Sequence, residues 1–301
     1  MCNADLDPIR NVLTWRRGDQ RAPHKPLLLL LQIARISRGE SRLAPYSWIH
    51  DRLESLLREF GPSRRSLHPE YPFWRLQKDG EFWDIPERAQ AEAALAERKR
   101  RSDCPPTILR SVDAHGGFTE AVDRHLRSSP EQLQTLAAEI LDEHFPSSLH
   151  DSLLNAVGMA WQAIAVPRRA RSPQFRESLV RIYEHRCAIC SFDGRVGYAD
   201  LALEAAHIQW HSYGGPDEPS NGLLLCALHH RALDRGAISL SDERRVVVSQ
   251  HLHGGAVVND MLLRFNGQPI RVPIEPQASV SLRSIRWHQR EVFRSPERSL
   301  S

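Results

Sequence analysis

The chain has 301 residues, of which 41% are hydrophobic and 26% charged, a composition typical of about two globular domains. Its 40 basic and 37 acidic residues give a net charge of +3, too small to indicate a nucleic-acid partner by itself. The only long apolar run, at 27–31, is much shorter than the roughly 20 residues of a membrane span, so we expect no transmembrane segment. The first residues are acidic and polar, unlike a secretory signal, and we therefore expect a cytoplasmic protein.

The first half of the sequence has a mainly helical pattern, because apolar residues recur every three or four positions. The segment 71–85 differs from the rest. Its aromatic residues lie on both sides of Asp79-Gly80, a common turn pair, which predicts a small β-hairpin with strands at 71–76 and 81–85. Helices are predicted at 6–15, 23–36, 46–60, 87–101, 118–126, 130–145 and 149–163. These elements together predict a mainly helical N-terminal domain over residues 1–165.

The segment 166–173 has the composition of a linker. Between Pro167 and Pro173 it holds three arginines and shows no apolar periodicity. We therefore expect a second domain at 174–301, which begins with a helix that ends near residue 184. Further along the chain, a β-hairpin is predicted at 237–249 and a basic helix at 285–290.

Cysteine and histidine occur in two short pairs within the second domain. Cys187 and Cys190 form the first pair, Cys226 and His229 form the second, and 35 residues separate the two. Two such pairs supply the four ligands that a structural zinc ion prefers in tetrahedral coordination. Because all four positions around the ion are then filled, we expect this Zn²⁺ to hold two segments together and not to take part in a reaction.

A second set of polar residues lies between and beside these pairs. The segment 201–208 is predicted to be a strand with His207 near its end, a loop then leads to Asn221, and a helix carries His230 and Asp234. The order His207, Asn221, His230 resembles the HNH, or ββα-metal, nuclease motif. This resemblance implies two strands and one helix around a divalent ion, here in a domain built around the structural zinc. The fold class expected for the whole chain is therefore α+β.

Phosphodiester hydrolysis at such a site implies a role for each residue. His207 is expected to act as the general base on water, since histidine accepts a proton near neutral pH. His230 is expected to bind a catalytic Mg²⁺, Mn²⁺ or other divalent ion, with Asp234, one helical turn later, as a second ligand. Asn221 either fixes the loop and orients His207 or contacts the metal. Ala206 departs from the family pattern, because several family members carry an acidic metal ligand at this place.

The N-terminal domain has a resemblance of its own. The segments 21–30, 60–62, 68–76 and 79–83 look like the sulfur-binding domain of restriction endonucleases that cut phosphorothioated DNA. This resemblance implies that Tyr71 and Pro72 form an apolar pocket for the sulfur atom, which is larger and less hydrated than the oxygen it replaces. The residues expected to contact phosphates or base edges are Arg21, His24, Lys25, Arg64, Arg65 and Arg75.

The two resemblances together predict a modification-dependent, type IV restriction endonuclease that binds phosphorothioated double-stranded DNA and cuts it nearby. We expect a homodimer, because cutting both strands with a single-metal site generally needs two active sites. Two alternatives stay open at this point: an HNH endonuclease directed to methylated or unmodified DNA, and a zinc-containing DNA-binding protein without cleavage. The second alternative leaves His207, Asn221 and His230 unexplained.

Overall fold

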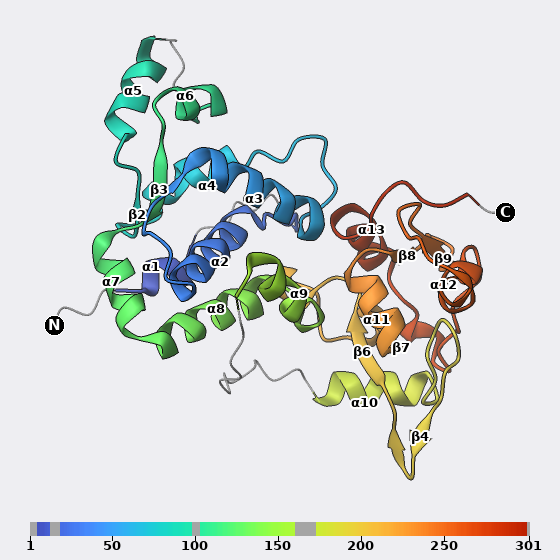
Figure 1. Ribbon diagram of the computed structural model, residues 1–301. Helices are drawn as coiled ribbons and strands as arrows, with labels where there is room; N and C mark the ends of the chain where they lie inside the picture. The colour runs from blue at the N-terminus through green and yellow to red at the C-terminus, as the bar shows by residue number, and fades with distance from the viewer. Residues whose placement is uncertain (1–4, 13–18, 98–102, 160–172, 300–301) are drawn as a thin grey trace. The chain divides into compact units, whose positions relative to one another are not determined.

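The computed structural model describes residues 5–12, 19–97, 103–159 and 173–299. The chain divides into two compact units, each assembled from separate stretches of sequence. The first unit comprises residues 1–17, 22–144 and 150–166, and the second comprises residues 18–21, 145–149 and 167–301. The predicted linker 166–173 lies outside the described residues except for Pro173. Helices dominate and the sheets are small (Figure 1), which confirms the predicted α+β class.

Helices form most of the first unit. They are α1 (Asp7–Arg10), α2 (His24–Ser37), α3 (Tyr46–Phe60), α4 (Glu70–Arg75), α5 (Arg88–Glu97), α6 (Pro106–Ser111), α7 (Glu120–Ser128), α8 (Pro130–His144) and most of α9 (Ser147–Val157). One small antiparallel sheet accompanies them, with β3 (His115–Phe118) between β1 (Ala44–Pro45) and β2 (Trp83–Asp84). The mainly helical character that the sequence predicts is therefore confirmed for this part of the chain.

Helix α2 forms the centre of the core of the first unit. All residues from Pro26 to Ile36 are buried, because α2 packs against α3, α4, α7 and α8. A helix that is apolar on every side must be covered on every side, and these four helices cover it. Neither α2 nor another helix in the described ranges is long and apolar enough to cross a membrane.

The predicted hairpin at 71–85 is wrong in its first strand. Residues 71–75 belong to helix α4, a 3-10 helix follows at Leu76–Lys78, and only β2 is a strand. Strand β2 pairs with β3 instead of with the segment 71–76. Pro72 lies in the first turn of α4, where the missing N–H is unpaired in any helix, so the proline is compatible with this structure. The buried side chains of such a short segment suit a strand or a helix equally well.

The second unit contains a larger share of strand. Its helices are α10 (Pro173–Ile182), α11 (Ala227–Asp234), α12 (Ala256–Met261) and α13 (Leu282–Glu291). Its strands are β4 (Arg195–Val196), β5 (Ala199–Asp200), β6 (Leu203–His207), β7 (Gly222–Cys226), β8 (Ile238–Leu240) and β9 (Val246–Val248). These strands form three two-stranded antiparallel sheets, β4-β5, β6-β7 and β8-β9. The hairpin predicted at 237–249 and the final basic helix are confirmed as β8-β9 and α13.

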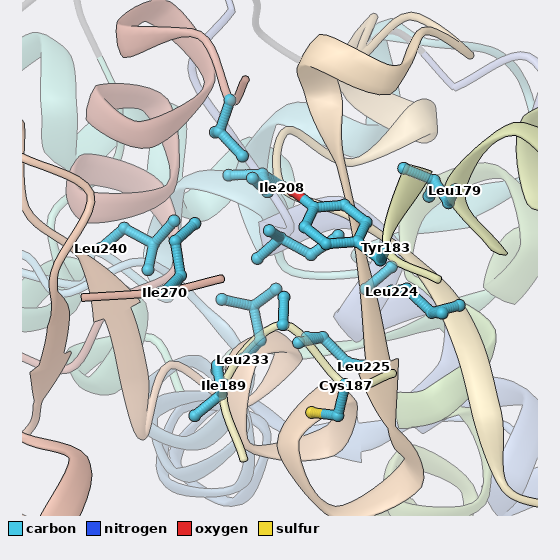
Figure 2. Packing of buried hydrophobic residues seen from close by; sticks show 14 of the residues in the cluster. Leu179, Tyr183, Cys187, Ile189, Ile208, Leu224, Leu225, Leu233, Leu240 and Ile270 are labelled. Atoms are coloured by element: carbon cyan, nitrogen blue, oxygen red, sulfur yellow. The ribbon is translucent and has the colours of Figure 1, made fainter. Parts of the chain in front are cut away.

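Strands β6 and β7 and helix α11 form the strand–loop–strand–helix arrangement that the sequence predicts. The two strands pair from Leu203 opposite Cys226 to His207 opposite Gly222, and α11 begins at the next residue after β7. All of β7 is buried, because α10 and α11 both pack against it. Figure 2 shows Leu224 and Leu225 of this strand among the side chains of the core of the second unit. The predicted ββα unit is therefore confirmed.

Gly222 allows helix α10 to lie close to the end of the β6-β7 hairpin. A Cβ at this position would meet Phe175 Cζ at 2.6 Å and Leu179 Cδ1 at 2.8 Å, both side chains of α10. Carbon atoms in ordinary contact are about 3.5 to 4 Å apart, so a larger residue would push the helix away. Because Gly222 is paired with His207, this close packing also sets the surroundings of that histidine.

From the buried position of His288 on α13, we predict that acid destabilises the second unit. His288 Nε2 donates to Leu233 O at 3.0 Å, and its Nδ1 lies 2.9 Å from Ser239 Oγ, a hydroxyl that can donate to the neutral ring. Burial, helped by the charge of Arg21, outweighs the opposing bond to Leu233 and the charge of Asp234 and lowers the pKa of His288 to about 4. The unfolded chain binds the proton first, and stability is therefore lost as the pH falls from 6.5 to 4, by about 3 kcal/mol.

Pulse proteolysis in urea at pH 7 and pH 4.5, with fragments of the second unit identified by mass spectrometry, measures this loss. His288→Gln serves as the comparison, because glutamine does not titrate in this range. Acid also weakens the Cys/His cluster, but it does so equally in both proteins, and the difference between them isolates His288. An equal loss of stability in the two proteins would contradict the prediction.

Candidate active site and metal centre

The four predicted zinc ligands lie together in the second unit. Their ligand atoms are all within 4.8 Å of one another, with Cys190 Sγ 3.9 Å from Cys226 Sγ and His229 Nδ1 3.8 Å from Cys187 Sγ. Sulfur atoms bound to one tetrahedral zinc ion are about 3.8 Å apart, so the cluster has the size that zinc requires. The first two cysteines lie in the turn after α10, Cys226 ends β7, and His229 lies in the first turn of α11. The residues present therefore fit a Zn²⁺ ion.

The adjacent histidines of α11 point to different surroundings. His229 faces the three cysteines, whereas His230 faces two carboxylates. Successive residues of a helix project about 100° apart, so one side chain can point into the Cys/His cluster while the next points away from it. Residue spacing on the helix alone explains this division.

His230 lies between carboxylates on opposite edges of its ring. Its Nδ1 is 2.6 Å from Glu204 Oε2, and its Nε2 is 3.2 Å from Asp234 Oδ2. Burial lowers the pKa of His230, but Asp234 and Glu204 outweigh it and raise the pKa to about 9. Asp234 is 3% exposed and also accepts a hydrogen bond from Ser148, whereas the Glu204 side chain is 47% exposed. An ion bound by one ring nitrogen therefore has only one of these carboxylates beside it.

His207 ends β6 and has a carboxylate partner of its own. Its Nε2 lies 2.7 Å from Asp217 Oδ1, and its ring stacks on Phe175 with centroids 4.2 Å apart and an angle of 18° between the planes. The aromatic ring of α10 thus supports one face of the imidazole while Asp217 sets its rotation. Both contacts restrict the ring to one orientation, as a general base requires.

Asn221 holds the loop that follows His207. Its side chain is buried; Oδ1 accepts from Gln209 N at 2.9 Å, and Nδ2 donates to Gln209 O at 2.9 Å and Pro216 O at 3.0 Å. Its own carbonyl accepts from Ile208 N at 2.9 Å. These bonds favour the first of the two roles considered for Asn221, which is to fix the loop and so to orient His207.

Sequence reasoning missed Glu204 and Asp217. Glu204 precedes Ala206 by two residues and therefore lies on the same face of β6, so strand alternation was the signal that pointed to it. Ala206 itself is fully buried, and no acidic side chain would fit there without a partner. Asp217 lies in a loop without periodicity, and no local pattern connects it with His207.

Two side chains of the first unit pack against the ring of Tyr71 on α4. His68 stacks on one side with centroids 4.5 Å apart and 4° between the planes, and the Arg75 guanidinium lies 4.4 Å from the ring centroid. Arg75 is held in turn by two hydrogen bonds to Asp103, at 2.6 and 2.5 Å. Pro72 is buried next to Tyr71. These contacts hold the Tyr71 ring in position.

Of the other predicted DNA contacts of the first unit, His24 and Lys25 are bonded within the protein, whereas Arg64 and Arg65 are exposed. His24 Nε2 donates to Leu67 O at 2.7 Å, and burial lowers its pKa. Lys25 forms an ion pair with Asp79 at 2.6 Å. Arg64 and Arg65 are exposed in the segment between α3 and α4. Helix α2, which begins at His24, packs against α4, so these residues and Tyr71 come from two neighbouring helices and the loop before α4.

Arg21 departs from its predicted role as a DNA contact. It belongs to the second unit, where its side chain is 4% exposed and its guanidinium lies 3.9 Å from the centroid of Trp210. Its Nη1 donates to Glu291 O at 2.9 Å. A guanidinium that is buried and already bound does not suit the contact of a phosphate or base edge.

Comparison with known proteins gave one family match in each half of the sequence. The family model of the ScoMcrA-like DNA sulfur-binding domain matches residues 4–162, and the HNH endonuclease family model matches residues 187–241. A search of curated proteins gave no match.

Solved structures similar to the chain include two of ScoMcrA. One is the "sulfur binding domain of ScoMcrA complexed with phosphorothioated DNA", at 27% identity and a TM-score of 0.45, covering 52% of this chain and 96% of that one. The other is the "Type IV phosphorothioation-dependent restriction endonuclease ScoMcrA", at 26% identity and a TM-score of 0.43. That match covers 53% of this chain and 28% of the restriction endonuclease.

Proposed function

The chain belongs to the family of ScoMcrA-like DNA sulfur-binding domains, and we propose that it is a type IV restriction endonuclease that acts on phosphorothioated DNA. The observation that carries the proposal is the presence of two matches in one chain, a sulfur-binding domain at 4–162 and an HNH endonuclease domain at 187–241. The first binds the modified linkage, and the second hydrolyses a phosphodiester bond nearby. We infer that the protein acts in the cytoplasm, because its proposed substrate is DNA.

Tyr71 and Pro72 form the pocket for sulfur in this proposal. A phosphorothioate sulfur is less hydrated than a phosphate oxygen, so an apolar surface favours it while the oxygen would lose water without gaining a donor. His68 and Arg75 both pack against the Tyr71 ring, which keeps it in one place for the ligand. The cationic side chains that bind the flanking phosphates and bases are Lys25, Arg64, Arg65 and Arg75, together with His24.

Hydrolysis is assigned to the residues of the β6-β7-α11 unit. His207 takes the proton from the attacking water, and Asp217 keeps its ring in position through Nε2. His230 and Glu204 hold a divalent cation, Mg²⁺ or Mn²⁺ or another ion, which when bound supplies positive charge at the phosphate and the leaving oxygen. Asp234, bound to the opposite ring nitrogen, orients His230 from behind in place of the direct metal contact that the sequence predicts.

A structural zinc ion completes the proposed nuclease domain. Cys187, Cys190, Cys226 and His229 fill its four positions, so the ion has no site left for water or substrate. It joins the turn after α10 to the start of α11, the helix that carries His230. The zinc therefore positions the catalytic helix without taking part in the reaction.

Cleavage of two otherwise identical synthetic duplexes tests the proposal. One carries a single stereodefined phosphorothioate in each strand, the other has none, and both are incubated with the protein in Mg²⁺ or Mn²⁺. We expect only the modified duplex to be cut. Equal cutting of both would support a nuclease directed to unmodified DNA and contradict the sulfur dependence. Tight binding without cutting of either would instead support the zinc-containing DNA-binding protein.

The same assay tests the proposed homodimer. Two active sites are needed to cut both strands in one binding event, so native gels are expected to show double-strand breaks as the first product. Nicked duplex that accumulates before any double-strand break would contradict a dimer with two coordinated sites.

A further inference from the structure

Three aromatic side chains of the second unit form a cluster beside the candidate active site. The ring centroids of Trp210 and Trp287 are 6.0 Å apart, and Tyr213 lies 6.4 Å from Trp210 and 6.1 Å from Trp287. Trp210 and Trp287 are almost fully buried. Trp210 follows His207 by three residues, so this cluster adjoins the segment that carries the general base.

Residues 19–21, here called the strap, cover this cluster. Asp19 O accepts a hydrogen bond from Trp287 Nε1 at 2.7 Å, and Asp19 Oδ1 accepts one from Arg290 Nη2 at 2.8 Å. Arg21 lies over Trp210 and donates its backbone N–H to Glu291 Oε2 at 3.0 Å. The strap is therefore bound to α13 and to Trp210, although about 190 to 270 residues of sequence separate it from these partners.

Arg21 and Glu291 are buried charged residues, and both are bonded within the protein: Arg21 Nη1 donates to the Glu291 carbonyl, and the Glu291 carboxylate pairs with Arg290 Nε at 2.8 Å. The side chain of Glu291 is 0% exposed and Arg21 is 4% exposed, so water stabilises neither charge. A buried charge without partners is strongly unfavourable, whereas a guanidinium that is hydrogen-bonded and lies over an aromatic face is tolerated. The placement of Arg21 is therefore specific and is not that of a surface arginine resting on the protein.

Trp210 lies within the loop 207–217, so contacts that fix Trp210 also restrict this loop. Its carbonyl accepts from Tyr213 N at 2.9 Å and from Gly215 N at 3.1 Å, which forms the turn that leads on to Asp217. A Cβ on Gly215 would meet Gln209 O at 1.8 Å, so the turn is tightly packed. The segment 207–217 begins with the general base, ends with its carboxylate partner and is held in the middle by Trp210.

We propose that Arg21 is a positioning residue for phosphodiester cleavage, which acts by covering Trp210 and so fixing the segment 207–217. The inference rests on the proposed function, and it replaces the role of Arg21 in DNA binding that the sequence predicts. Arg21 touches neither substrate nor metal in this proposal. Its effect reaches the reaction through the position of His207 relative to Asp217.

Hydrogen exchange of the DNA-free, zinc-loaded chain gives the first test. Arg21→Ala is expected to raise amide exchange at 208–217 at least tenfold and to leave the first unit unchanged. Arg35→Ala is the matched control, since Arg35 is also buried and lies 4.7 Å from the ring centroid of Trp48, within the first unit. Arg35→Ala is expected to leave exchange at 208–217 unchanged. Unchanged exchange at 208–217 in Arg21→Ala would overturn the proposal.

Single-turnover cleavage at saturating phosphorothioated duplex gives the second test. Arg21→Ala is expected to lower the cleavage rate constant at least tenfold while the Kd for DNA stays within twofold. Arg21→Lys keeps the charge but loses the planar stacking on Trp210. Its cleavage rate constant is therefore expected to lie between those of the parent and Arg21→Ala, at least threefold below the parent. A weaker Kd with an unchanged rate constant would return Arg21 to the DNA contacts and overturn the proposal.

These two tests separate the inference from the function on which it rests. If the parent protein cuts no duplex, the proposed function fails, while hydrogen exchange still decides whether Arg21 fixes the loop. If Arg21→Ala does not fold, Arg21→Lys decides both questions, and a rate and an exchange pattern equal to those of the parent would overturn the proposal.

Discussion

Replacing His207 with alanine is expected to reduce the cleavage rate constant by about a hundredfold to ten-thousandfold, the usual contribution of general acid–base catalysis. The affinity for DNA is expected to stay within twofold, because binding is assigned to the first unit. Asp217→Asn should lower the rate less, since the imidazole stays in place but loses the carboxylate that sets its rotation. Single-turnover rates on phosphorothioated duplex, with Kd measured separately by anisotropy, check both results.

His211 supplies the matched control for this prediction. Its ring centroid lies 6.0 Å from that of His207, and its side chain is exposed. His211→Ala therefore removes an imidazole from the same loop without removing the proposed base, and a rate within twofold of the parent is expected. A His207→Ala protein that keeps more than a tenth of the parent rate would exclude His207 as the base.

Loss of the proposed zinc ion is expected to lower the unfolding temperature of the second unit strongly and to abolish cleavage. A ligand present at 1,000 times its Kd contributes about 4 kcal/mol to stability, and zinc at a closed Cys/His site binds at least this tightly. For a chain of this size that corresponds to a fall in Tm of about 10 °C or more. Cys187→Ser, analysed by metal content and by thermal unfolding, is expected to lose both the ion and this stability.

Cys104 provides the comparison for the zinc ligands. It is a buried free cysteine of the first unit, and burial raises the pKa of its thiol to about 11, so it remains protonated and unreactive. Cys104→Ala is expected to keep about one zinc ion per chain and the parental melting of the second unit. Equal zinc content in Cys187→Ser and Cys104→Ala would show that Cys187 is not a ligand.

The parts of the site that could be predicted from sequence are those set by short spacings. The two residues between Cys226 and His229 bring both side chains to one end of a helix, and the neighbouring His230 must then point elsewhere. Strand β6 and helix α11 were predictable because their apolar residues follow a clear period. These features depend only on residues that lie close together in the sequence, and they can therefore be predicted from it.

Features that depend on distant contacts were not predictable in this way. Arg21 meets Glu291 across 270 residues, and nothing near Arg21 in the sequence indicates an acidic partner. Tyr71 and its neighbours formed a helix because α2 and α4 pack together, while their own pattern allowed a strand. Asp217 finds His207 only when the loop closes, and the closure depends on the buried bonds of Asn221.

The second unit is assembled from three separate stretches of sequence, so its contacts form in stages during protein synthesis. Glu291 is synthesised 270 residues after Arg21, so the strap binds α13 only after that helix has been made. A product that stops before α13 has the strap but not the helix that binds it. Such a product contains His207, Asn221 and His230 but lacks the contacts of the strap with Trp287 and Glu291.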